Sequence, residues 1–349
     1  MKAYLILENG AVFEGESFGA QGETTGEIVF TTGMTGYIET LTDPSYYGQI
    51  VLQTFPLIGN YGIIPEDMES AGIEAKAYIV KYPCREPSNF RSTANLDSFL
   101  KERGVIGLCG IDTRALTRLI RNNGTMNGKI TTTPPTDADR DQAKAHSIHN
   151  PVAEVSAPTA PTERGGYRVA FMDFGAKRGI AEALTARGCE VISFPYNSSA
   201  AEILACEPQG IMLSNGPGDP EDPANIAIVE TIRLLETSGI PIFGICLGHQ
   251  LLARAKGYTT QKLKFGHRGA NQPVKDCATG KVYITSQNHG YEVIAHDCSF
   301  VNVNDGSCEG LDYGRSFSVQ FHPEARGGPL DTAFLFEKFL ERMDDHAAR

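Results

Sequence analysis

One cysteine, Cys246, lies in a context that suits a nucleophile. Residues 244–250 read Gly-Ile-Cys-Leu-Gly-His-Gln, after an apolar run at 240–243 and before a helix-like run at 250–255. A strand is therefore expected to turn sharply into a helix at the cysteine, and flanking glycines permit so tight a corner. Free N–H groups and the helix dipole there favour a thiolate and can hold an oxyanion. The alternative, a small buried core cysteine, fits this context poorly.

A nucleophilic thiol needs a base, and His322 is the best placed of the eight histidines. It follows a strand-like run at 316–321 and precedes Pro323 and Glu324. A carboxylate two residues on can hold the far ring nitrogen and fix the tautomer, as in a catalytic triad. We therefore expect Cys246, His322 and Glu324 to act together. Taken alone, His-Pro-Glu is equally consistent with a surface turn.

Other segments offer supporting groups. His289, in the Gln-Asn-His-Gly sequence at 287–290, ranks second as a base, whereas His249 is expected to pack or cap the helix after the cysteine. The loop 214–220, Ser-Asn-Gly-Pro-Gly-Asp-Pro, follows a predicted strand, and its glycines can bring backbone N–H groups close to a ligand. It lacks the lysine of a phosphate-binding loop, so nucleotide binding is not supported, and a simple turn is the alternative.

Composition limits the class of protein. The 349-residue chain carries a net charge of −11 without a lysine- or arginine-rich block, which argues against binding to nucleic acid or an anionic membrane. Its eight cysteines form no C-x-x-C pair and no zinc-like spacing with histidines, so we predict reduced thiols and no metal site. The N-terminal apolar run is too short for a signal peptide, and no run of about 18 apolar residues occurs. We therefore expect a cytoplasmic protein.

The first half, residues 1 to about 130, is expected to form a strand-rich α+β domain. Short β-branched and apolar runs alternate there with Gly, Asn and Asp turns. The predicted strands are 4–7, 11–13, 27–31, 49–54 and 75–80, and the predicted helices are 96–103 and 112–122. Asp112 or Thr113 can cap the second helix. Residues 131–166, rich in Pro, Thr and Ala, are expected to be a linker with a short helix near 139–146.

Residues 167–349 are expected to form an α/β domain with a mostly parallel central sheet, because strands and helices alternate. The predicted strands are 168–173, 189–194, 210–214 and 241–245, and the predicted helices are 176–187, 200–206 and 223–238. Strand-like runs then follow at 262–265, 282–285, 292–295 and 317–321, before a helix at 332–343. Parallel sheets place their chemistry at the carboxyl ends of strands, where the cysteine corner is expected.

Three blocks together resemble the class I, triad-type glutamine amidotransferases. They are Gly-Pro-Gly at 216–218, the cysteine block at 244–250 and His-Pro-Glu at 322–324, all in the family's order. In that family the cysteine attacks the carboxamide of glutamine and the histidine relays protons. Ammonia leaves, and a γ-glutamyl thioester is hydrolysed to glutamate.

The resemblance implies a role for each matching residue. Cys246 would be the nucleophile, His322 the general base and then acid, and Glu324 the orienting carboxylate. The matching glutamine-binding positions are Ser45 of the Asp-Pro-Ser motif, Gly216, Gly218, Leu247, Gln250, Asn288, Gly290 and Tyr291. The backbone N–H groups of Leu247 and of a glycine in the 216–218 loop would form the oxyanion hole.

Two of these positions need comment. Ser45 would be read as a turn serine without the resemblance. Tyr291 stands where the family often has Phe. The change is benign if the contact is through the backbone, and it shifts affinity if the ring packs on the substrate.

The first half resembles the small subunits of carbamoyl-phosphate synthases. The matching segments are 33–37, 41–47, 89–91, 110–117 and, at the start of the second domain, Asp-Phe-Gly-Ala-Lys at 173–177. This resemblance covers essentially the whole chain. It implies a heterodimer, or a higher oligomer, with a large subunit that binds ATP and Mg²⁺. That subunit would use the ammonia, with bicarbonate, to make carbamoyl phosphate for arginine or pyrimidine synthesis, whereas this chain is expected to hold no cofactor.

Two alternatives keep the fold and change the function. A free-standing γ-glutamyl hydrolase or cysteine peptidase would need no partner, but it leaves the N-terminal domain of about 130 residues unexplained. A non-catalytic regulatory subunit would not need the intact Cys246, His322 and Glu324.

Overall fold

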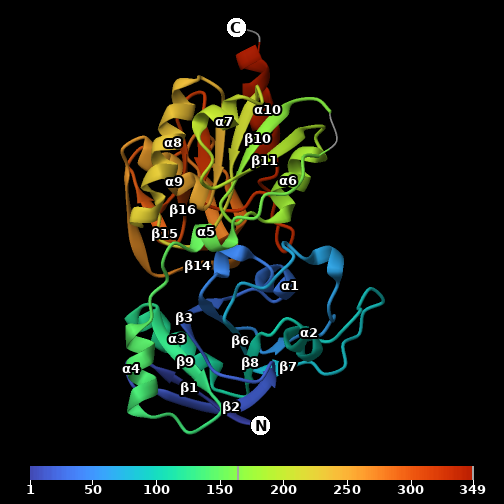
Figure 1. The fold of residues 1–349 in the computed structure, drawn as a ribbon, viewed down its shortest axis with the longest axis vertical. Coiled ribbons are helices and arrows are strands. Elements are labelled where there is room, and N and C mark those ends of the chain that lie inside the picture. Colours follow the sequence, from blue (N-terminus) through green and yellow to red (C-terminus); the bar gives the residue numbers. More distant parts are fainter. Residues whose placement is uncertain (163–164, 348–349) are drawn as a thin grey trace. The chain divides into compact units, whose positions relative to one another are not determined.

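The computed structural model describes residues 1–162 and 165–347, and the chain divides into two compact units, Met1–Ile148 and His149–Arg349 (Figure 1). The division falls inside the segment 131–166 that was expected to be a linker. That segment contains two short helices, α4 (Asp137–Ala145) in the first unit and α5 (Pro151–Val155) in the second. A capping box between Thr136 and Asp139 explains why α4 begins earlier than predicted. Residues 163–164 of the expected linker lie outside the described residues.

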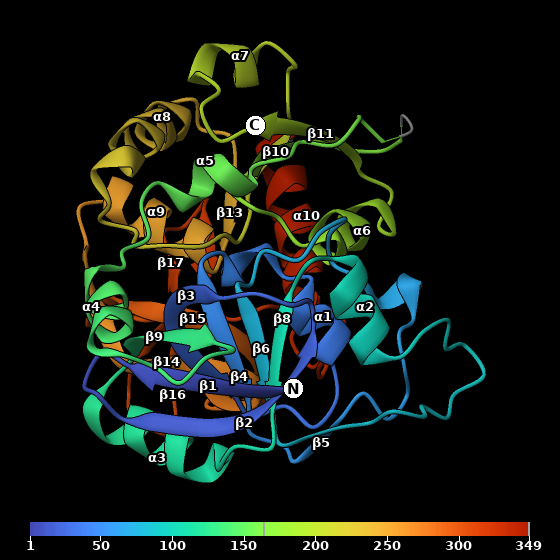
Figure 2. The same ribbon diagram turned by 60° about the horizontal axis from the view of Figure 1, so that its bottom comes forward.

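The first unit is built on a closed seven-stranded barrel with the strand order β1-β2-β8-β6-β4-β3-β9. The strands are β1 (Lys2–Leu7), β2 (Val12–Gly19), β3 (Thr24–Thr31), β4 (Gln49–Gln53), β6 (Ala77–Val80), β8 (Ile106–Cys109) and β9 (Met126–Thr131). Figure 2 shows β1, β2 and β9 together at one side of this barrel. The strand-rich α+β character is thus confirmed, and closure pairs every barrel strand on both edges.

Helices cover this barrel, and their starts follow from capping residues. They are α1 (Tyr37–Leu41), α2 (Leu96–Glu102) and α3 (Thr113–Asn123). The unit also contains short 3₁₀ turns at Pro44–Tyr46 and Pro65–Asp67, and a two-stranded ribbon of β5 (Leu57–Ile58) and β7 (Tyr82–Pro83). Asn95 accepts the N–H of Ser98 at 2.9 Å and begins α2. Asp112 accepts the N–H of Ala115 at 2.9 Å and begins α3, as the sequence predicts.

The second unit contains a nine-stranded sheet with the order β11-β10-β12-β13-β18-β17-β15-β14-β16. The strands are β10 (Arg168–Asp173), β11 (Glu190–Pro195), β12 (Gly210–Leu213), β13 (Ile242–Ile245), β14 (Thr259–Asp276), β15 (Val282–Ile294), β16 (Phe300–Asn302), β17 (Cys308–Asp312) and β18 (Phe317–Val319). Neighbours from β11 to β18 pair in parallel, and the remaining neighbours pair antiparallel. The expected α/β architecture is confirmed, with parallel pairing confined to one half of the sheet.

Helices pack on both faces of this sheet (Figure 1). They are α6 (Arg178–Thr185), α7 (Ala200–Leu204), a 3₁₀ turn at Pro223–Asn225, α8 (Ile226–Thr237), α9 (Leu247–Ala255) and α10 (Phe334–Ala347). Alternate residues of β10 separate the faces. Val169 and Phe171 belong to the core under α6 and α10, whereas Ala170 and Met172 belong to the core under α7, α8 and α9. The sheet therefore forms the middle of three layers.

The runs predicted as separate strands at 262–265, 282–285 and 292–295 belong to one long hairpin. In it, β14 has 18 residues and pairs with the 13 residues of β15. Register shifts between Lys262 and His267 and between Gly269 and Gln272 interrupt the regular alternation of side chains. These β-bulges explain why the sequence pattern looks like short, unconnected strands.

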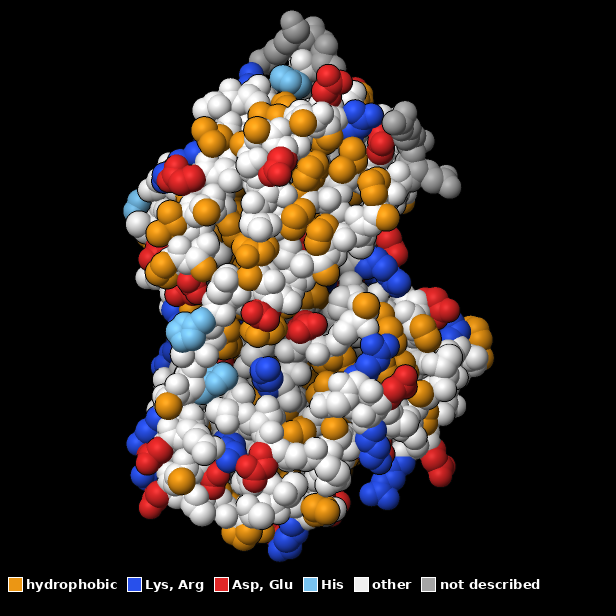
Figure 3. Space-filling model, in the orientation of Figure 1, with side chains coloured by type: hydrophobic (Ala, Val, Ile, Leu, Met, Phe, Trp, Pro, Cys, Tyr) orange, Lys and Arg blue, Asp and Glu red, His pale blue; other side chains and the backbone are white. Residues whose placement is uncertain are grey.

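On the face drawn in Figure 3, basic and acidic side chains are interspersed rather than separated into patches. Within residues 1–162 and 165–347, no helix combines the length and the apolar character needed to cross a membrane.

Candidate active site

Cys246 occupies the turn between β13 and α9 in a strained backbone conformation. Its φ is 55° and its ψ is −107°, values that a non-glycine residue rarely adopts. The N–H of Cys246 donates to the carbonyl of Val319 at 2.9 Å, which ties the turn to the neighbouring strand β18. The side chain is buried, with 2% of its surface exposed. Such strain is typical of functional positions, which agrees with Cys246 as the candidate nucleophile.

The two glycines beside the cysteine are required for close packing rather than for an unusual φ of their own. A Cβ on Gly244 would lie 2.6 Å from the carbonyl oxygen of Gly248, and a Cβ on Gly248 would lie 2.3 Å from that of Leu213. Both distances are too short for real contacts. The helix therefore lies directly against β12 and β13, and the positive φ falls on Cys246 itself. This corrects the expectation that the glycines supply the strained backbone.

His322 and Glu324 form a short, fully enclosed hydrogen bond. The Nδ1–H of His322 donates to Oε1 of Glu324 at 2.6 Å, and the two side chains are 2% and 0% exposed. The N–H of His322 donates to the carbonyl of Ser286 at 2.9 Å, which fixes the chain just after β18 against β15. Among the described residues, Nε2 of His322 has no hydrogen-bond partner. That nitrogen is therefore not occupied by another group and can exchange a proton with the thiol.

Charges control the ionisation of this pair. Burial is the largest single influence on His322 and favours the neutral ring, but the charge of Glu324 and the side-chain contacts of the ring with Cys246 and Glu324 together outweigh it, so that the pKa of His322 is raised to about 10. Burial likewise favours protonated Glu324, but the charges of Lys177 and His322 lower the pKa of this carboxyl. Glu324 thus stays ionised at neutral pH and stabilises a proton on His322.

Lys177 is a member of this group that sequence reasoning did not assign to the site. Its Nζ donates to the same Oε1 of Glu324 at 2.9 Å, and the two side chains are 8% and 0% exposed. The N–H of Lys177 donates to Oδ1 of Asn215 at 2.9 Å, and Nδ2 of Asn215 donates to the carbonyl of Gly175 at 3.1 Å. The segment 173–177 therefore joins the Gly-Pro-Gly loop to the carboxylate. The resemblance of segment 173–177 to the small-subunit family was the sequence signal that could have indicated Lys177.

The predicted oxyanion-hole residues lie side by side. Leu247 is the first residue of α9, so its N–H has no acceptor within the helix. The next N–H, of Gly248, already donates to the carbonyl of Ser214 at 3.0 Å. A Cβ on Gly216 would lie 2.9 Å from Cδ2 of Leu247, so only glycine lets the loop approach so closely. Gly218 has a φ of +99° and a tight contact with Pro151 that also excludes a side chain.

Besides Leu247, four predicted glutamine-binding residues lie on α9 and β15 beside the thiol. Sγ of Cys246 lies 3.6 Å from the carbonyl oxygen of Asn288. Nε2 of Gln250 donates to the carbonyl of Tyr291 at 2.9 Å. Gly290 lies between Asn288 and Tyr291 in the strand. The helix that carries the cysteine is thus bonded to the strand segment 288–291.

The ring of Tyr291 lies beside a cation. Nζ of Lys262 is 6.0 Å from the ring centroid. The carbonyl of Tyr291 accepts hydrogen bonds from Gln250 and from Nδ1 of His289. The carbonyl of Tyr291 thus ties α9 to β15.

The other two histidines near the cysteine are held in structural contacts. Nδ1 of His289 donates to the carbonyl of Tyr291 at 2.8 Å, Nε2 lies 3.0 Å from Oε1 of Gln287, and burial holds the pKa of the ring well below its usual range. His249 is fully buried and bonded through Nδ1 to Ser318 at 2.8 Å, and burial lowers its pKa to about 3. His322, with its free Nε2, is the better candidate base.

Ser45 belongs to the first unit, so its predicted contact with glutamine stays a prediction. It lies in the 3₁₀ turn Pro44–Tyr46, and its N–H donates to Oδ1 of Asp43 at 2.9 Å. The side chain is largely buried.

Comparison with known families and proteins agrees with this geometry. Residues 5–130 match the family model described as "Carbamoyl-phosphate synthase small chain, CPSase domain", and residues 170–342 match "Glutamine amidotransferase class-I". A carbamoyl phosphate synthase small chain from Bacillus cereus is 51% identical, covering 99% of this chain and 97% of the relative. One from Clostridium perfringens is 50% identical, covering 98% and 99%.

A third relative, from Bacillus subtilis, is described as a carbamoyl phosphate synthase pyrimidine-specific small chain. It is 49% identical, covering 99% of this chain and 96% of the relative. Similarity of this extent includes both units and the segment between them. The chain therefore belongs to the family of carbamoyl phosphate synthase small chains.

Proposed function

We propose that this chain is the glutaminase subunit of a carbamoyl-phosphate synthase and hydrolyses L-glutamine to glutamate and ammonia. One observation carries the proposal. Cys246 lies buried on a strained strand-to-helix turn beside His322, whose Nδ1 proton is held by the ionised Glu324. This arrangement suits transfer of an acyl group to a thiol.

In the proposed mechanism, Nε2 of His322 takes the thiol proton, and the thiolate of Cys246 attacks the carboxamide carbon of glutamine. The N–H of Leu247 and an N–H of the 216–218 loop hold the resulting oxyanion. The imidazolium returns its proton to the leaving nitrogen, the C–N bond breaks and ammonia departs. His322 then deprotonates a water molecule, which attacks the γ-glutamyl thioester and releases glutamate and the thiol.

We further propose that the glutamine side chain lies between the helix α9 and the strand β15. Its ligands would be Ser45, Gly216, Gly218, Leu247, Gln250, Asn288, Gly290 and Tyr291, with Tyr291 contributing through its backbone. The bonds from Gln250 to Tyr291 and from Cys246 to Asn288 support the part of this set that lies in the second unit.

The remaining chemistry is proposed for a large-subunit partner, in a heterodimer or a higher oligomer. That subunit would bind ATP and Mg²⁺ and convert bicarbonate and ammonia to carbamoyl phosphate, for arginine synthesis, pyrimidine synthesis or both. Ammonia in water at neutral pH is mostly ammonium, which is not a nucleophile. A closed path between the two active sites would keep it in the reactive form.

The test is glutamate release by the purified chain, with and without a carbamoyl-phosphate synthase large subunit. We expect weak activity alone, a strong increase with the partner, and loss of both with Cys246→Ser. Cys277→Ser, at an exposed thiol, is the matched control and should change nothing. Full activity without the partner would indicate a free-standing hydrolase, and activity that survives Cys246→Ser would refute the proposed nucleophile.

A further inference from the structure

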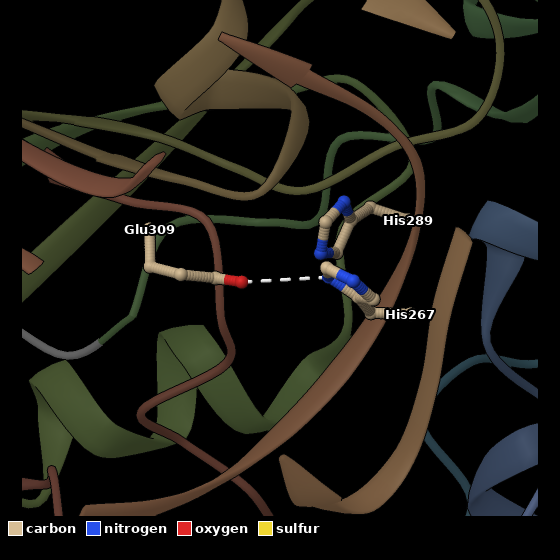
Figure 4. Close-up of side chains that lie close together, drawn as sticks. All are labelled: His267, His289 and Glu309. Carbon is tan, nitrogen blue, oxygen red and sulfur yellow. Dashed lines mark ion pairs between the residues drawn. The ribbon is translucent and has the colours of Figure 1, made fainter. Parts of the chain in front are cut away.

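Three buried side chains outside the proposed catalytic group meet within the second unit (Figure 4). They are His267 of β14, His289 of β15 and Glu309 of β17. One nitrogen or oxygen atom from each lies within 4.8 Å of the others. Figure 4 shows the two imidazole rings next to each other, with the carboxylate of Glu309 directed toward His267.

The outer nitrogens of both rings are held by acceptors. Nε2 of His267 lies 2.8 Å from the carboxylate of Asp305, and Nδ1 of His289 lies 2.8 Å from the carbonyl of Tyr291. Carboxylates and carbonyls accept hydrogen bonds, so these nitrogens carry protons. In neutral rings, the inner nitrogens then present lone pairs to the centre of the group. Histidines that bind metal ions in proteins are oriented in this way.

One pair of the inner atoms, from His267 and Glu309, is spaced as two ligands of one metal ion rather than as a short hydrogen bond. Nδ1 of His267 lies 3.4 Å from Oε1 of Glu309, longer than the roughly 2.7–2.9 Å of a charge-assisted hydrogen bond. Two ligands about 2.1 Å from a tetrahedral Zn²⁺ are separated by about 3.4 Å. In the described part of the chain, Nδ1 of His267 and Oε2 of Glu309 have no hydrogen-bond partner.

A fourth oxygen also faces this centre. Oε1 of Gln287 lies 3.0 Å from Nε2 of His289, so two lone-pair acceptors are in contact. A cation between them would make this contact favourable. The metal-free alternative is a rotated Gln287 amide, which would donate to His289, together with a proton shared by His267 and Glu309.

We propose that His267, His289 and Glu309 bind one divalent metal ion of the zinc type, with Gln287 or water as the fourth ligand. Two neutral histidines and a carboxylate are a common ligand set for Zn²⁺. The charge of such an ion would be balanced by the carboxylates of Glu309 and Asp305. The three ligands come from three strands without short spacing between them, which is why the sequence predicted no metal site.

The site would stabilise the strand that lines the catalytic thiol. His289 is the residue after Asn288, whose carbonyl oxygen lies 3.6 Å from Sγ of Cys246. A metal ion would fasten this segment to the bulged strand β14 and to β17. The proposal does not depend on the glutaminase function, and its test does not use activity.

The test measures zinc content in a Cys246→Ser background, which removes the catalytic thiol as a competing ligand. After exhaustive chelation, the full chain is dialysed against Zn²⁺ and the bound metal is determined by mass spectrometry. We expect one Zn²⁺ per chain, and its loss in His267→Gln and in Glu309→Gln. His296→Gln, at an exposed histidine just after β15, is the matched control and should retain it. Asp305→Asn, which loosens His267, should weaken binding by about 10- to 100-fold.

Co²⁺ binding to the chain with His267, His289 and Glu309 unchanged provides a second measurement. A site of nitrogen and oxygen ligands should give weak visible absorption bands without the intense near-ultraviolet bands of cobalt–thiolate bonds. Absence of stoichiometric binding to the Cys246→Ser chain would overturn the proposal. So would thiolate bands, or binding that persists in both ligand variants.

Discussion

The ionisation of His322 depends on one carboxylate, so Glu324→Gln is the most informative single change at the residue scale. The amide keeps the shape of the side chain and removes the charge that raises the pKa of His322. Burial and Lys177 both oppose a proton on the ring, so the pKa of His322 should fall. We expect the rate of glutamine hydrolysis to fall by roughly 10²- to 10⁴-fold.

Nuclear magnetic resonance of histidine-labelled protein would measure this pKa, with His322→Asn used to assign the signal. Glu337→Gln is the control, because Glu337 is a half-exposed carboxylate paired with Arg187. It should leave both the pKa and the rate unchanged. A pKa of His322 that stays the same or rises in Glu324→Gln would contradict the electrostatic account.

Single residues differed in how well the sequence could predict them. Cys246, His322 and Glu324 stand in short motifs that indicate chemistry, and the structure brings His322 and Glu324 into direct contact. Lys177 lies 147 residues from Glu324 along the chain, and its environment depends on a contact that no local pattern encodes. The same is true of His267 and Glu309, which were not singled out by any motif.

At the scale of elements, the strand-to-helix turn depends on the closeness of α9 to β12. We predict that Gly248→Ala lowers the free energy of unfolding of the second unit by about 1–3 kcal/mol, because its Cβ would lie 2.3 Å from the carbonyl oxygen of Leu213. Displacement of the helix would also move Cys246, so glutaminase activity should be lost. Urea unfolding and glutamate release measure the two effects.

Gly72→Ala is the control for this change. A Cβ there would meet the flexible carboxylate of Glu74 at 3.2 Å and, among the described residues beyond its chain neighbours, no other atom within 4 Å. This variant should be nearly as stable and active as the original chain. If Gly248→Ala behaved in the same way, the close packing of α9 would not be what positions the thiol.

Elements with a regular pattern were predicted well, and elements that depend on distant pairing were not. The alternation of strands and helices from residue 168 onward indicated the α/β sheet, because strands such as β10 and β13 are apolar runs buried on both faces. The barrel of the first unit closes through β1 with β9 and β2 with β8, which are far apart in sequence. Local patterns carry no signal for such closure, so β8 and β9 were missed.

At the scale of the whole molecule, the buried His322–Glu324 pair couples stability to pH. Because the pKa of His322 is raised on folding, its contribution to the free energy of unfolding is complete below its ordinary pKa of 6.5. That contribution is lost as pH rises through the pKa of the folded state. Because the pKa of Glu324 is lowered on folding, its contribution to the free energy of unfolding is present above its ordinary pKa of 4.5. That contribution is lost as pH falls through the pKa of the folded state. Both contributions are therefore complete only between about pH 4.5 and 6.5.

We predict that His322→Asn destabilises the chain more at pH 6 than at pH 9. At pH 6 the variant lacks the charged ring that shares Glu324 with Lys177, whereas at pH 9 the unfolded chain holds a neutral His322, and folding of the original chain must take up a proton, which offsets part of the same stabilisation. Each unit of difference between the folded and unfolded pKa corresponds to about 1.4 kcal/mol.

Urea unfolding followed by circular dichroism gives the free energies, and limited proteolysis assigns the transition of the second unit. His296→Asn, at an exposed histidine, should have the same small effect at both pH values. A destabilisation by His322→Asn that grows from pH 6 to pH 9 would mean that His322 is held as a neutral ring, and that Glu324 and Cys246 together do not outweigh the burial of His322.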